Sequence, residues 1–215
     1  MSTSRSAFIQ SHAQLPDTLP VFPLSNAVLL PGGGLPLNIF EPRYLRMVED
    51  ALQGDRLVGM IQPRDDGDVP ALCDVGCAGR ITQYAETGDG RLEIVLTGVC
   101  RFRIAEEFPS VRGYRLVQPD WSLFGHDYDD EVVSESQLRL FKAVLRSYLE
   151  EQKMQVDWEL LDKLDVTQLS SSLVSVLPLA ADEKQLLLES PDLGQRLTLF
   201  SSLLGASASA VGTRH

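Results

Sequence analysis

Residues 35–54 read LPLNIFEPRYLRMVEDALQG, and this stretch contains a complete set of helix signals inside a segment rich in strand signals. Pro42 stands where a first helical turn tolerates proline, and Gly54 follows the last periodic residue, an asymmetry typical of helix starts and ends. Tyr44, Leu45 and later apolar residues recur at helical spacing. The pattern predicts a helix over about 41–53 that packs one face on a sheet.

The residues at the start of this helix are expected to act as a structural brace. Glu41 can accept N–H bonds at the helix start or pair with an arginine such as Arg101 or Arg103. We expect Phe40 and Tyr44 to hold the helix against the sheet. The brace comprises Phe40, Glu41, Pro42, Arg43 and Tyr44.

Around this helix, residues 17–117 consist of short apolar runs separated by turn formers. The sequence TGDG at 87–90 lies between two alternating segments and predicts a β-hairpin. Arg91 and Glu93, and further along Arg101 and Arg103, alternate with apolar neighbours, so one face of these strands is expected to be wet. Several strands at short spacing favour a curled β-sheet or pseudo-barrel.

The second part of the chain changes to helical periodicity. Residues 132–205 are predicted to form a helical bundle, with helices over about 133–152, 166–177, 182–188 and 190–204, the last ending at Gly205. We expect residues 1–16 and 206–215 to be flexible. The stretch 118–131 is acidic with interleaved aromatic residues, and two interpretations stay open for it, a solvated linker and a contact loop. The fold class is therefore α+β.

Composition excludes several functions. The 215 residues hold 19 Lys and Arg against 30 Asp and Glu, a formal charge of −11, which disfavours nucleic acid and anionic membranes as main partners. No apolar run reaches the roughly 18 residues of a membrane span, and the first residues lack a signal peptide's apolar core. Three cysteines, an odd number, suit a reducing compartment, and we interpret them as buried thiols in a strand region. The expectation is a soluble cytoplasmic protein without metal or cofactor.

A search for catalytic motifs finds none. There is no G-x-S-x-G elbow, and the cluster PGGG at 31–34 is not followed by the lysine of a phosphate loop, so we interpret it as a turn. The four lysines are predicted to lie on exposed helix faces. Carboxylates at 65–68 lack the remaining ligands of a calcium loop. Five arginines gather late in the β-rich part and either pair with Glu93, Glu106 and Glu107 or hold an acidic partner: Arg80, Arg101, Arg103, Arg112 and Arg115.

Several segments together resemble the N-terminal domain of the Lon protease family. The opening LPVFPL at 19–24 is followed by VLLPG at 28–32 and by the long, chemically unusual block PLNIFEPRY at 36–44. Further likeness lies at GCAGRI (76–81), GVCRFRI (98–104) and DEKQLLLE (182–189), so the resemblance spans about residues 17–204. It implies a PUA-like curled sheet followed by a helical bundle.

The resemblance also implies a function. In the full protease this domain helps to recognise and hold substrate polypeptide, whereas separate ATPase and Ser-Lys peptidase domains do the chemistry. The sequence has no Walker motif and no setting for a Ser-Lys dyad, so we expect a stand-alone, non-enzymatic module. We expect it to bind unfolded or extended polypeptide in a groove between sheet and bundle. A protease or its substrates are possible partners. The candidate polypeptide-binding residues are Pro31, Gly32, Gly33, Arg80, Arg101 and Arg103.

Two alternatives from other classes stay open. One is a PUA-like nucleic-acid-binding module that uses Arg80, Arg101 and Arg103, although the charge of −11 disfavours it. The other is an enzyme whose pocket carries no recognisable motif, which a cluster of strongly perturbed acidic groups in a deep cleft would indicate.

Overall fold

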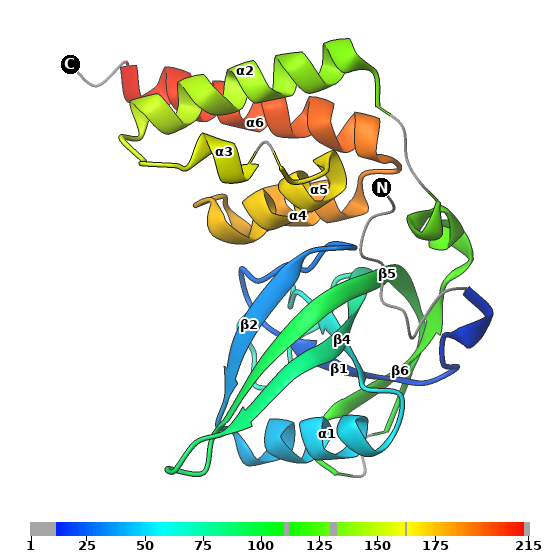
Figure 1. Ribbon diagram of the computed structural model, residues 1–215. Helices are drawn as coiled ribbons and strands as arrows, with labels where there is room; N and C mark the ends of the chain where they lie inside the picture. Colours follow the sequence, from blue (N-terminus) through cyan, green and yellow to red (C-terminus); the bar gives the residue numbers. More distant parts are fainter. Residues whose placement is uncertain (1–11, 110–111, 130–132, 162, 213–215) are drawn as a thin grey trace.

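The computed structural model describes residues 12–109, 112–129, 133–161 and 163–212. It is an α+β protein in which one curled sheet lies between helix α1 and a group of helices from the second part of the chain (Figure 1). The strands are β1 Leu19–Pro23, β2 Gly34–Ile39, β3 Leu57–Ile61, β4 Val75–Glu86, β5 Leu92–Phe108 and β6 Arg115–Asp120.

Strand β5 organises the sheet because it is long enough to pair with three others. The strand order is β2-β5-β4-β3-β1-β6, with a further pairing between β5 and β6 that closes the sheet on itself. Among the strands of the described residues, β1 and β3 run parallel and the other pairs are antiparallel. The first half of β5 pairs with β2, and its second half pairs with β6. The predicted curled sheet is therefore present.

The predicted first helix is α1, Pro42–Gln53, with Pro42 in its first turn. The Gly54 N–H donates to the carbonyls of Asp50 and Ala51, which ends the helix. Tyr44 is buried, and its ring centroid lies 4.2 Å from that of Phe22 on β1. Tyr44 thus holds the helix on the sheet as expected.

Two expectations about the brace are wrong. Phe40 does not help to hold α1, because it lies just beyond the end of β2 with 63% of its surface exposed. Glu41 pairs with Arg43, at 2.9 Å from guanidinium to carboxylate, rather than with Arg101 or Arg103. A neighbour two residues away is within reach of a short carboxylate, whereas both other arginines have acidic partners of their own.

The second part of the chain is helical, and its longest helices, α2 and α6, pack against each other through Phe141 and Phe200, whose ring centroids are 5.5 Å apart. Ser134 and Gln137 form a capping box at the start of α2, and Asp165 caps α4. The helical elements are η1 His12–Gln14, η2 Ser122–Tyr128, α2 Glu135–Glu151, α3 Trp158–Leu161, α4 Val166–Val176, α5 Ala181–Glu189 and α6 Leu193–Gly212.

The predicted ends of the chain need correction. Helix α6 does not stop at Gly205 but continues to Gly212, because one glycine inside a run of alanine and serine costs a helix only about 1 kcal/mol. Residues 12–14 form η1, and the Pro16 carbonyl accepts the Trp121 indole N–H at 3.1 Å. The expected flexibility of residues 1–11 and 213–215 lies outside the described residues.

The stretch 118–131 is a contact loop over the part that is described. Residues 118–120 complete β6, and η2 packs along β5 through the buried Phe124. The side chain of Asp127 is 2% exposed. The interpretation as a solvated linker is therefore wrong for residues 118–128.

One glycine allows the segment before β2 to cross β5. A Cβ added to Gly98 would lie 2.0 Å from the Leu30 carbonyl oxygen, a distance that no side chain tolerates. The Gly32 N–H donates to the Gly98 carbonyl at 3.0 Å, and the Gly98 N–H donates to the Gly33 carbonyl at 2.8 Å. This crossing sets where β2 begins and directs β2 along the first half of β5.

Candidate functional site

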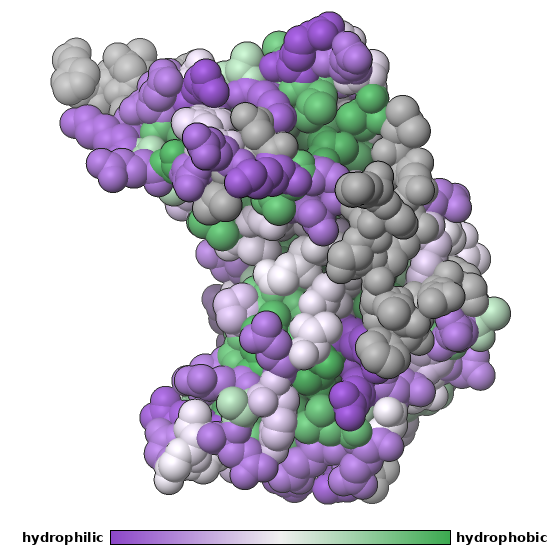
Figure 2. Space-filling model, in the orientation of Figure 1, coloured by the Kyte–Doolittle hydropathy of each residue, from purple (hydrophilic) through white to green (hydrophobic). Residues whose placement is uncertain are grey.

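A hollow of about 420 Å³ lies over the first half of β5 and its two neighbours, β2 and β4. The outline of the molecule is concave beside β2, between the helical half and the hairpin that joins β4 to β5 (Figure 2). The lining residues are Pro36, Leu37, Asn38, Gln83, Tyr84, Ala85, Glu93, Ile94 and Val95.

The shape of the hollow follows from irregularities in the strands. The register between β4 and β5 shifts between Ile81 and Gln83, which is the mark of a β-bulge and bends β4. Strand β2 pairs within the described residues only with β5, so it is an edge, and Pro36 in its middle makes this edge a poor template for an added strand. A ligand is therefore directed to the face of these strands rather than to the edge.

Pairing across the strands identifies the side chains that share this face. Val95 lies opposite Pro36 on β2 and Gln83 on β4, and Glu93 lies opposite Asn38 and Ala85. Residues directly opposite in antiparallel strands point to the same face. The result is an apolar floor with amide and carboxylate groups beside it.

The hairpin beyond the hollow carries acidic groups. The Tyr84 hydroxyl donates a hydrogen bond to the carboxylate of Glu86, and this bond raises the pKa of Tyr84. Tyr84 lies opposite Ile94, so its side chain belongs to the other face of the sheet from Glu93 and Ala85. Asp89 in the turn is 3.0 Å from the Arg91 guanidinium.

The structure places the glycine-rich candidates away from the hollow. Pro31 and Gly33 are buried, whereas Gly32 is exposed with a positive φ of 74°. The Pro31 carbonyl accepts a hydrogen bond from the Ser171 hydroxyl of α4 at 2.9 Å, and Gly33 lies against Ser171. This turn is a support for α4, and among its first three residues only Gly32 faces solvent.

Arg80 and Arg103 are the more accessible arginine candidates, and they lie apart from the hollow. The Arg80 guanidinium donates to the Asp55 carbonyl at 3.1 Å. Arg103 is exposed and pairs with Asp120 at 3.1 Å. The three arginine candidates therefore do not converge on one surface.

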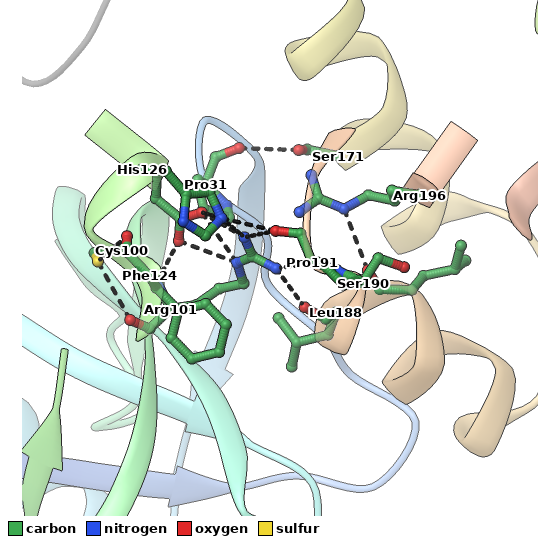
Figure 3. A network of polar contacts seen from close by, with 12 residues as sticks. Pro31, Cys100, Arg101, Phe124, His126, Ser171, Leu188, Ser190, Pro191 and Arg196 are labelled. Atoms are coloured by element: carbon green, nitrogen blue, oxygen red, sulfur yellow. Dashed lines mark hydrogen bonds and ion pairs between the residues drawn. The ribbon is translucent and has the colours of Figure 1, made fainter. Parts of the chain in front are cut away.

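Arg101 is fully buried, so the expectation of a wet face is wrong at this residue. Its guanidinium is 2.7 Å from the Asp127 carboxylate. It also lies 4.6 Å from the centre of the Phe124 ring (Figure 3). It also donates to the Leu188 and Ser190 carbonyls at the end of α5, at 3.0 and 2.5 Å. The error arises because η2 and α5, both distant in sequence, cover this part of β5.

His126 completes the cluster around Arg101. Its Nε2 lies 2.7 Å from the Pro191 carbonyl and 3.0 Å from the Arg101 guanidinium (Figure 3). A carbonyl only accepts, so a proton on Nε2 suits the contact with Pro191. We call Arg101, His126 and Asp127, with the carbonyls they contact, the inter-half clamp.

Three further hydrogen bonds join α5 to the sheet and to the loop before β2. The side chain of Gln62, the residue that follows β3, donates to the Ala181 carbonyl at 2.8 Å. The side chain of Gln185 donates to the Val75 carbonyl at 3.0 Å. The Lys184 ammonium donates to the Asn26 carbonyl at 3.1 Å. A polypeptide placed between α5 and the sheet would have to compete with these contacts.

Lys184 also corrects the expectation that all lysines are exposed. It is 5% exposed, and burial lowers its pKa from the ordinary value. Its ammonium is directed to a backbone carbonyl. We interpret Lys184 as a contact that holds α5 to the loop before β2.

The described thiols are not activated as nucleophiles. Cys77 and Cys100 are buried in strands, as predicted, whereas Cys73 is half-buried before β4 begins, so the prediction is wrong for this residue. Burial raises the pKa of all three thiols. Among the residues that the structure describes, no three His, Cys, Asp or Glu side chains gather as metal ligands. Likewise, no described helix has the length and apolar composition needed to cross a membrane.

Sequence reasoning missed most of the residues of the hollow. Glu93 was placed correctly on a wet face by its alternation with apolar neighbours, and the hairpin was located by its turn. Asn38 and Ala85 carried no signal of their own, because their common face depends on the register between three strands. A smaller hollow of about 210 Å³ lies between α2 and α6 and was also unforeseen.

Comparison with known proteins gives a consistent result. Residues 18–206 match the family model described as the ATP-dependent protease La (LON) substrate-binding domain. A Lon protease from Trichlorobacter lovleyi is 29% identical over 216 residues, covering 94% of this chain and 26% of its own length. Lon protease 2 from Myxococcus xanthus is 26% identical over 198 residues, covering 88% and 24%. The chain thus spans about a quarter of the length of these relatives.

Solved structures agree with this match. A Lon N-terminal domain protein from Xanthomonas campestris is 26% identical, with 86% of this chain and 97% of that chain covered and a TM-score of 0.64. The N-terminal domain of a Mycobacterium avium complex Lon protease has a TM-score of 0.66 with 87% and 98% coverage. At 18% identity, the second likeness concerns the fold alone.

Proposed function

This chain belongs to the family of ATP-dependent protease La (LON) substrate-binding domains, and on that basis we propose that it holds unfolded or extended polypeptide without cleaving it. The observation that carries the proposal is the match of this family model to residues 18–206. The relatives' names state a protease, but the part of them that this chain matches is the substrate-binding domain. The role is that of a recognition or adaptor module in the cytoplasm.

We propose the hollow over β2, β5 and β4 as the place of binding. It offers an apolar floor, polar groups beside it and a volume of about 420 Å³, which falls within the usual range of ligand sites. An extended chain could lay alternate side chains on this face. The proposal replaces the groove between sheet and bundle, and it leaves Arg101 out of direct contact.

The experiment is a titration of a labelled, permanently unfolded polypeptide with this protein, followed by fluorescence anisotropy. Saturable binding that a folded control polypeptide does not show is expected. The Ala85→Gln variant places a neutral amide in the hollow and should weaken binding several-fold. Ala105→Gln is the matched control, because Ala105 is also exposed but lies in the second half of β5.

The outcomes separate function from location. No saturable binding across a panel of unfolded polypeptides would overturn the proposed function. If the Ala85→Gln and Ala105→Gln variants bind unfolded polypeptide equally tightly, the proposed function stands but the hollow is not its site.

A further inference from the structure

One carboxylate in the hollow has no partner among the described residues. Glu93 is exposed in the middle of the face, between Asn38 on β2 and Ala85 on β4. No hydrogen bond or ion pair joins its side chain to another group in the described part of the chain. It differs in this respect from Glu41 and Glu107, each of which holds an arginine.

The basic residue nearest along the strand is already engaged. The Arg91 guanidinium lies 3.0 Å from the carboxylate of Asp89 and 6.0 Å from the centre of the exposed Phe40 ring. The cation of Arg91 is therefore held by Asp89 and not by Glu93.

The spacing of charge and apolar surface along β5 matches an extended chain. Glu93 and Val95 are two residues apart on one strand and share its outer face. Side chains two apart in an extended peptide also share a face, at about 6.6 Å for two residues. A peptide lying along β5 can then set an apolar side chain over Val95 and a cationic one beside Glu93.

Resting on the proposed function, we propose that this hollow selects polypeptide segments in which lysine or arginine stands two residues from an aliphatic or aromatic side chain. The apolar side chain contacts Pro36, Ala85 and Val95, and the cation pairs with Glu93. The occupant is an unfolded segment of another protein, and the surface discriminates against acidic segments because like charges repel.

The test uses three labelled peptides of matched length, with lysine, glutamine or glutamate two residues from a leucine. The lysine peptide is expected to bind roughly tenfold more tightly than the glutamate peptide. The Glu93→Gln variant should reduce affinity for the lysine peptide by about two- to fivefold, the range for an exposed ion pair, and leave the glutamine peptide unchanged. A fourth peptide places the lysine next to the leucine and should lose this advantage.

Glu106→Gln is the matched control, because Glu106 is also exposed on β5 and the substitution changes the net charge equally. An equal effect of Glu93→Gln and Glu106→Gln would show that only the overall charge of −11 matters, and this would overturn the inference. Equal binding of all four peptides would overturn it while the proposed function stands. If no peptide or unfolded polypeptide binds, both are overturned.

Discussion

The two halves of strand β5 hold their charged residues in opposite ways. In the first half, Glu93 stands exposed on an open face and has no partner in the described part of the chain. In the second half, Arg101 is fully buried and engages a carboxylate, an aromatic ring and the end of a helix. The contrast shows how one strand can serve two purposes. Arg101 has all its partners within the chain and positions the helices against the sheet. Glu93 is unpaired, and its carboxylate is available to a ligand.

The largest effect expected from breaking this contrast is that of Arg101→Met. The substitution leaves Asp127 buried without its cation, and such losses cost about 3–5 kcal/mol in the free energy of unfolding. Urea denaturation of the variant and the wild type measures the difference. The double variant Arg101→Met with Asp127→Leu removes both charges and should recover most of the loss. A single variant within about 1 kcal/mol of the wild type would contradict the role of the inter-half clamp.

The next effect concerns the point where the two halves of β5 meet. Gly98→Ala places a Cβ against the Leu30 carbonyl and must displace the segment before β2, so a loss of about 3 kcal/mol is expected. Thermal or urea unfolding measures it. The control is Gly88→Ala in the hairpin turn, where nothing lies within 4 Å of the added Cβ. Equal stabilities of the two variants would show that the segment before β2 can shift away from position 98 without a loss in the free energy of unfolding.

A smaller, pH-dependent effect is expected beside the inter-half clamp. At the start of α6 the Asp192 carboxylate accepts the Gln195 N–H at 2.7 Å, and this bond holds the pKa of Asp192 below its ordinary value of 3.8. A lowered pKa in the folded state means stability that is present above 3.8 and lost as the pH falls through the folded-state value.

Asp192→Asn keeps the acceptor but removes the titration. At neutral pH the variant should be less stable by about 0.5 kcal/mol, since a charge at a helix start contributes little when partly exposed. The difference should vanish as the pH is lowered below 3.8, as urea midpoints at a series of pH values would show. A constant difference at all pH values would assign the effect to hydrogen-bond geometry instead of charge.

Sequence patterns located features that depend on near neighbours. The α1 helix followed from Pro42 and Gly54, and the hairpin followed from a glycine that adopts a φ of 82° at position 90. Patterns failed where distant segments meet. The burial of Arg101 depends on η2 and α5, and that of Lys184 depends on the loop at Asn26. The face shared by Asn38, Glu93 and Ala85 depends on register, which no single segment encodes.

The smallest stability effect is expected at Arg103, two residues beyond Arg101 on the same strand. Its ion pair with Asp120 spans 3.1 Å, but the two side chains are 49% and 28% exposed, so water competes for both charges. Arg103→Ala should change the free energy of unfolding by less than about 0.5 kcal/mol. Titration of the same variant with unfolded polypeptide decides whether Arg103 belongs to the binding surface. Because Arg103 lies outside the hollow, we expect unchanged affinity, and a several-fold loss at unchanged stability would extend the surface along β5 to this arginine.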